Sequence, residues 1–312
     1  MDHYSPLSNP HRPVRVPYLG GQYDDLGFAG YPSRANWDIG RLQEGDFHGA
    51  TRGEAARFLQ TWLYFGLLHE FLDTTIEEID FFRTDGPEGD AITTAKLPDY
   101  LRRWKVQFDE LQPAAREAHN ERLVEGFSSS YYVWRGFVDK ERDNGIPNPI
   151  PPEIELSIQV LATTLEHCAN VVCEIPVAVL PWRLARNPWL TRRMIGDGWC
   201  PSVIEQIWNP THLAVQYFAS ILGPPARQLD HSTCEAGNGG CNARTVVDET
   251  YVTKHKTQFC KCMFLGVNPE NLSRIIRASD IPLISVMWGA SGPSLELVPF
   301  RDGMKYTAIS HV

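Results

Sequence analysis

Residues 231–262 read HSTCEAGNGGCNARTVVDETYVTKHKTQFCKC, and this stretch decides which fold the chain is expected to adopt. It holds four of the seven cysteines and two of the ten histidines of the chain, namely Cys234, Cys241, Cys260, Cys262, His231 and His255. Zinc binds four thiolate or imidazole ligands in a tetrahedron and fixes loops that lack a core of their own. The density of these side chains therefore predicts a structural zinc site, although the spacings differ from those of a zinc ribbon.

The simplest ligand set consists of the four cysteines of this stretch, and either histidine can replace one of them. We expect one zinc ion. Cys234 and Cys241 would bind it from one arm. His255, with either Cys260 or Cys262, would bind it from the other, and these two cysteines would share one face of a strand. Two ions are an alternative if a cysteine bridges them.

A further candidate ligand lies upstream of the cluster. Cys200 precedes Pro201, which is well placed to begin a helix, and the N–H groups at a helix start favour a thiolate. Such a thiol can be a metal ligand, a reactive nucleophile or a buried capping residue. The cysteines of the cluster have alternatives too, because free cysteines are often small buried hydrophobic residues and exposed ones can form disulfides or serve redox chemistry.

Composition excludes several classes of protein. The chain has 312 residues, 43% of them hydrophobic, and carries 29 basic and 38 acidic side chains for a net charge of −9. The hydrophobic content supports a sizeable core, and the negative charge makes binding to nucleic acid or to an anionic membrane unexpected. The N-terminus lacks an apolar signal sequence and no apolar run is long enough to span a bilayer. We therefore expect an intracellular, cytoplasmic protein whose thiols stay reduced, which favours metal binding over disulfides.

Hydrophobic periodicity predicts an α+β fold with a mainly helical N-terminal body and a small zinc-braced β-rich module. Residues 1–50 lack any period and are expected to form a loosely ordered arm. A helical domain should span residues 51–230, and a zinc-binding α+β module should span 231–303. Residues 304–312 form a separate short end.

The helical domain has recognisable start signals and faces. Thr51 and Glu54 match a capping box, and the apolar face that follows is broad enough to be buried on several sides. A second helix should begin near Pro98, and a third from Pro152. The stretch 127–140, FSSSYYVWRGFVDK, is ambiguous between strand and helix. The remaining two cysteines fall among apolar residues at helical spacing, which predicts core positions for Cys168 and Cys173.

The end of the chain predicts strands. Residues 244–253 and 259–267 alternate or are β-branched, residues 271–278 read as a short helix, and residues 281–289, 294–300 and 305–312 read as strands. Arg301, Asp302 and Gly303 form a turn signal that would join the last two strands as a hairpin.

The final segment KYTAISHV resembles the opening strand of the fungal heterokaryon incompatibility (HET) domain. The matching residues are Tyr306, Ala308, Ile309, Ser310, His311 and Val312. Upstream, FLQTWLYFGLLHEF, GWCPS, the H-x2-C with its later cysteine, and YVTKH with CKC resemble the region that precedes this domain in large fungal proteins. The resemblance implies a protein of fungal non-self recognition and programmed cell death, of which only about the first nine HET residues are present.

We therefore expect a non-enzymatic regulatory or recognition region, with a protein partner or a downstream HET domain as the element it contacts. The alternative is a metal-dependent hydrolase or a cysteine enzyme that uses the 231–262 cluster. The sequence contains no H-E-x-x-H, zinc-deaminase, G-x-S-x-G or dinucleotide-binding motif to support this alternative.

Overall fold

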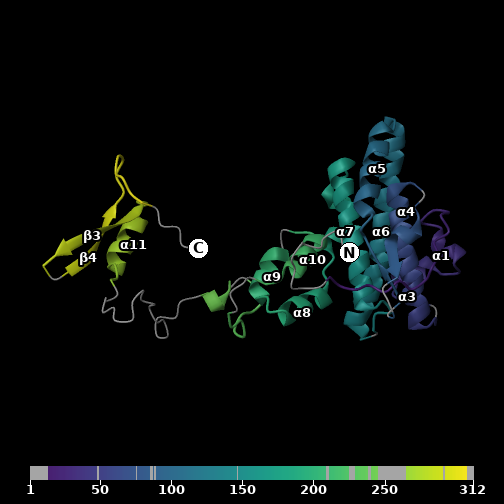
Figure 1. The fold of residues 1–312 in the computed structure, drawn as a ribbon, viewed down its shortest axis with the longest axis horizontal. Coiled ribbons are helices and arrows are strands. Elements are labelled where there is room, and N and C mark those ends of the chain that lie inside the picture. The colour runs from purple at the N-terminus through teal and green to yellow at the C-terminus, as the bar shows by residue number, and fades with distance from the viewer. Residues whose placement is uncertain are drawn as a thin grey trace. The chain divides into compact units, whose positions relative to one another are not determined.

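The computed structural model describes residues 13–307, apart from residues 48, 75, 85–86, 88, 146, 209–210, 225–228, 238–239, 245–264 and 291. It divides into two compact units, Met1–Thr245 and Val246–Val312. The first is built mainly from helices, and the second contains a helix and a two-stranded antiparallel sheet, so the predicted α+β class is confirmed (Figure 1). Within the described residues, no helix is both long enough and apolar enough to cross a membrane.

The centre of the first unit is one continuous helical run. It comprises α3 (Arg52–Gln60), a π-helical segment η2 (Thr61–Gly66) and α4 (Leu67–Leu72). The predicted capping box begins it: the Glu54 amide donates to Oγ1 of Thr51 at 3.3 Å, and the Thr51 amide donates to the Glu54 carboxylate at 2.9 Å. All six residues of η2 are buried. The run is therefore enclosed on several sides, as its broad apolar face predicts.

Three long helices pack with this run, namely α5 (Leu97–Glu110), α6 (Pro113–Asn144) and α7 (Pro152–Val172). Figure 1 shows α4, α5 and α6 lying side by side. The ambiguous stretch 127–140 is part of α6. It lacks a clean one-sided period because its apolar residues meet different neighbours: Phe127 packs near Phe71, and Trp134 packs near Trp182.

Residues 13–47 pack against these helices, which differs from the loosely ordered arm predicted for residues 1–50. They include the short helices α1 (Tyr31–Arg34) and α2 (Ile39–Gln43). Tyr23 and Phe28 are buried, and Nε1 of Trp62 donates to the Phe28 carbonyl at 3.0 Å. At the end of α2 the backbone approaches α6 so closely that a Cβ at Gly136 would overlap the carbonyl group of Gln43. These contacts are made one residue at a time, so they leave no period in the sequence.

Short elements connect the long helices. They are η3 (Glu78–Phe81), the antiparallel pair β1 (Phe82–Thr84) and β2 (Asp90–Ile92), η5 (Val177–Val179) and η6 (Pro181–Leu184). Glu166, buried in α7, fixes the start of η6, because its two side-chain oxygens accept hydrogen bonds from the amides of Trp182 and Arg183 at 2.8 and 2.9 Å.

The last part of the first unit consists of α8 (Pro188–Gly196), α9 (Pro201–Trp208) and α10 (Leu213–Leu222), followed by a loop and the single turn η7 (Asn242–Arg244). Helix α10 packs on α7. Tyr217 of α10 is buried, and its hydroxyl accepts a hydrogen bond from the Val14 amide at 3.0 Å. The two distant ends of this unit therefore meet at α10.

The second unit contains α11 (Pro269–Arg277), β3 (Pro282–Gly289) and β4 (Gly292–Pro299). The two strands pair antiparallel, from Pro282 opposite Pro299 to Gly289 opposite Gly292. The turn predicted at residues 301–303 is present, since the Met304 amide donates to the Arg301 carbonyl at 3.0 Å, but the hairpin of this unit joins β3 to β4, where the chain reverses between the two glycines. Residues 304–307 form no strand, and residues 308–312 lie outside the described residues. Of the strands predicted for 244–253 and 259–267, residues 245–253 and 259–264 also lie outside the described residues, and residues 265–267 form no strand.

Candidate metal centre

Cys200 stands at the start of α9. Its carbonyl accepts the first helical hydrogen bond, from the amide of Ile204 at 3.0 Å, and Pro201 follows as the first helical residue, where a missing N–H costs nothing. The side chain of Cys200 is buried, with 3% of its surface exposed. The sequence therefore places this thiol at a helix start, as expected.

The loop after α10 carries three more ligand groups. The amide of Cys234 donates to the carbonyl of His231 at 2.9 Å, which forms a tight turn between these two residues. The side chain of Asn242 donates to the carbonyl of Thr233 at 2.9 Å, and this bond holds Cys241 beside the turn. The loop is thus folded back on itself by hydrogen bonds, with its sulfur atoms on the inside.

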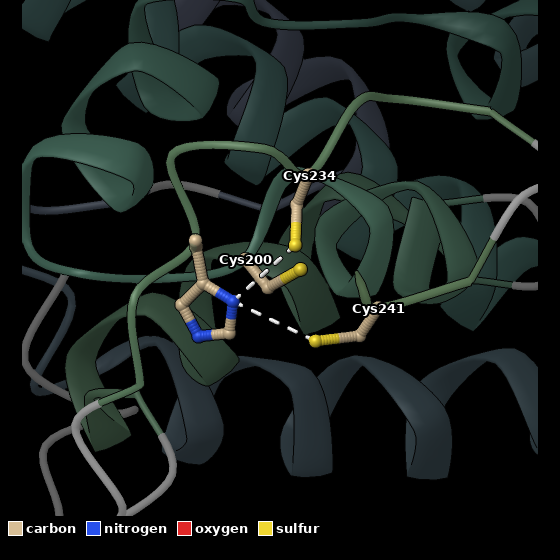
Figure 2. A group of neighbouring side chains, drawn as sticks. Cys200, Cys234 and Cys241 are labelled. Carbon is tan, nitrogen blue, oxygen red and sulfur yellow. Dashed lines mark hydrogen bonds between the residues drawn. The ribbon is translucent and has the colours of Figure 1, made fainter. Parts of the chain in front are cut away.

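Four side chains converge at this point: Cys200, His231, Cys234 and Cys241. Their ligand atoms all lie within 4.8 Å of one another, and Nδ1 of His231 is 3.6 Å from each of two sulfur atoms, those of Cys234 and Cys241. Figure 2 shows the three labelled cysteines with their sulfur atoms directed toward a common centre. Metal–sulfur bonds of about 2.3 Å and metal–nitrogen bonds of about 2.0 Å at the tetrahedral angle put S and N about 3.5 Å apart. The group could therefore hold a metal ion with little movement.

The surroundings shift the pKa values of two of the thiols in opposite directions. The contact with His231, together with the backbone N–H of Ala243, lowers the pKa of Cys234 to about 7. Burial raises the pKa of Cys200 above its ordinary value, although N–H groups of α9 act in the opposite direction. A bound cation would favour the thiolate form of each cysteine. The site thus has one thiol that ionises near neutral pH and one that needs a cation beside it.

The structure brings together four of the seven residues that the sequence predicts as ligands. His255, Cys260 and Cys262 lie outside the described residues. The four residues that the structure brings together nevertheless supply four ligand groups, which is the number that a tetrahedral site needs. The ligand-bearing loop lies in the first compact unit, which extends to Thr245, whereas the domain boundary predicted from the sequence lies before residue 231.

The two cysteines predicted as core residues lie at the end of α7. Cys173 is buried and Cys168 half-buried. Burial raises the pKa of Cys168 to about 11 and that of Cys173 to about 12. Both are therefore protonated thiols at neutral pH, and neither belongs to the four-residue group.

No family model, curated protein sequence or solved structure matches this chain.

Proposed function

We propose that the four-residue group holds a structural zinc ion, and that the chain is a non-enzymatic recognition or regulatory region. The observation that carries the zinc assignment is the convergence of three thiols and one imidazole at tetrahedral spacing. Tetrahedral sites of sulfur and nitrogen ligands are typical of zinc. The ion would join the start of α9 to the loop after α10, two segments that are separate in the sequence.

The completeness of the ligand set supports a structural role. A catalytic zinc keeps an open position for water, whereas four protein ligands close the tetrahedron. Cys234 beside His231 also resembles the thiolate–imidazole pair of cysteine enzymes. However, Cys200 and Cys241 lie within the same 4.8 Å and crowd the position that a substrate would need. The hydrolase and cysteine-enzyme alternatives are therefore the weaker ones.

The biological setting that we propose is that of a fungal HET-type protein, in non-self recognition and programmed cell death. Its support is the resemblance of residues 306–312 to the first HET strand and of the GWCPS, H-x2-C and CKC motifs to the region upstream. In this setting the region would act through a protein partner or a HET domain downstream. A reducing compartment such as the cytoplasm would keep the three ligand thiols available.

Elemental analysis of the purified chain, combined with thermal unfolding before and after a strong chelator, tests the zinc assignment. We expect about one zinc per chain and a large loss of stability on chelation, since structural zinc contributes roughly 10–16 kcal/mol of apparent binding free energy in small zinc peptides. A metal-free protein that unfolds cooperatively and does not respond to chelators would refute it.

A further inference from the structure

A polar cavity of about 410 Å³ lies where the N-terminal segment meets α4 and α6. Its walls include Tyr23, Asp25, His69, Glu70, Asp73 and Arg122. None of these residues belongs to the metal centre. The cavity is therefore separate from the metal centre.

His69 presents an unused hydrogen-bond acceptor there. Its side chain is 9% exposed, and Nδ1 lies 2.7 Å from the carboxylate of Asp25. Burial lowers the pKa of His69, so the ring is neutral at pH 7. The proton then sits on Nδ1, where it is donated to Asp25, and Nε2 carries a lone pair. Nε2 is buried and has no hydrogen-bond partner in the described part of the chain.

Tyr23, which lines the same cavity, also has a buried polar atom without a hydrogen-bond partner in the described part of the chain. The residue is 4% exposed, its ring centroid is 5.1 Å from that of His69, and its hydroxyl is also buried without a partner among the described residues. Unpaired buried polar groups each cost free energy. Both residues line this cavity, and a ligand that reached these two atoms would supply the missing hydrogen bonds.

The charges of the wall define what that ligand must be. Asp25, Glu70 and Asp73 contribute carboxylates, and the side chains of Asp25 and Asp73 are about half exposed. Arg122 is the cation of the wall, and its guanidinium already binds Asp73 at 2.7 Å. The wall therefore offers hydrogen-bond acceptors and negative charge in excess. Anions and neutral acceptors fit it poorly.

The backbone gives this wall an unusual geometry. Asp25 and Asp73 both adopt positive φ, at 56° and 46°, a conformation that costs free energy for residues other than glycine. A second cavity of about 540 Å³ shares Tyr23, Asp25 and His69 and adds the carboxylates of Glu77 and Glu78. The acidic surface thus continues into a second cavity that shares the Asp25–His69 pair.

We propose that this cavity binds a small organic cation that carries a guanidinium or primary ammonium group. Its charge is balanced by Asp25, Glu70 and Asp73. Its N–H groups donate to the carboxylates and to the two unused acceptors, Nε2 of His69 and the hydroxyl of Tyr23. The cation is either a free amine compound or an arginine or lysine side chain of a peptide, and the binding chemistry is the same for both.

Calorimetric titration of the full, metal-loaded chain with agmatine, which carries both cationic groups, tests the proposal. A short arginine-containing peptide with blocked termini is the second probe, and N-butylurea, which has N–H groups but no charge, is the negative control. Saturable binding of either cation at millimolar concentration or below, without binding of the urea, supports the proposal and identifies the source. Failure of both cations to bind overturns it.

Variants then locate the site. Asp25→Asn should weaken binding about tenfold or more, because it removes a charge-assisted hydrogen bond, and asparagine tolerates positive φ. Asp109→Asn, which removes an exposed carboxylate of α5 away from the cavity, is the matched control and should bind like the wild type. Tyr23→Phe retains the ring and should lose severalfold affinity. Wild-type affinity in both Asp25→Asn and Tyr23→Phe, each shown to be folded by thermal unfolding, overturns the proposal.

Discussion

Replacing Cys200 by serine distinguishes the ligand set of the structure from the set in which residues 255–262 form the second arm. Serine has nearly the shape of cysteine and can still cap α9, so the main loss is one metal ligand. The matched control is Cys168→Ser, which changes a half-buried cysteine that takes no part in the site.

The size of the effect follows from the number of ligands. If about 10–16 kcal/mol of apparent binding free energy is divided among four ligands, each contributes about 2.5–4 kcal/mol. For a unit of this size, about 1 kcal/mol corresponds to a change in Tm of about 2–4 °C. Cys200→Ser should therefore lower Tm by about 10 °C, and Cys168→Ser by an ordinary 1 kcal/mol or so.

Thermal unfolding with and without chelator, together with zinc content, provides the measurement. In the wild type and in Cys168→Ser, chelation should lower Tm by similar amounts. In Cys200→Ser this response should be much smaller, because less zinc is bound at the start. If Cys200→Ser keeps a full zinc ion and the wild-type response to chelator, Cys200 is not a ligand and the argument from convergence is wrong.

Two further predictions concern the packing of the helical body. Gly136→Ala should destabilise the protein by about 3 kcal/mol in chemical denaturation, because the new Cβ overlaps the Gln43 carbonyl. Gly53→Ala is a helical control with nothing within 4 Å of the new Cβ, and it should be neutral or stabilising. Equal effects of the two substitutions would show that α2 does not dock at Gly136. Burial raises the pKa of Glu166 to about 8 and that of Glu155 to about 7, so the folded state holds protons that the unfolded state releases above about pH 4.5. The free energy of unfolding should therefore fall as pH rises from about 4.5 to 8, and Glu166→Gln should flatten this slope; an unchanged slope would contradict the assignment.

Local signals in the sequence predict the local structure of the helical body. The capping box at Thr51 and the start of α5 near Pro98 are predicted correctly because each depends on residues within a few positions of one another. The stretch 127–140 could not be assigned, because α6 buries different faces against different neighbours. The ordered packing of residues 13–47, with its two short helices, is not predicted for a related reason, since single aromatic side chains such as Phe28 enter the core without a repeating pattern.

At the metal centre, too, the local features are predicted from the sequence and the long-range contacts are not. Ligand types and the pairing of Cys234 with Cys241 follow from the density of cysteine and histidine in one stretch. The contribution of Cys200 depends on how α8, α9 and α10 fold back on themselves, which no local spacing encodes. Its position before Pro201 marked it as one candidate among seven but could not rank it above Cys260 or Cys262.

The hydrogen bond between the Val14 amide and the Tyr217 hydroxyl joins residues 203 positions apart, and this separation affects how the protein folds. A contact between residues so far apart in the sequence closes a very large loop, and the entropic cost of closing that loop must be met before the contact contributes any stability. Tyr217 also reaches its native place only after α10 has packed on α7. The contact between Val14 and Tyr217 can therefore form only after α10 has been made and packed on α7.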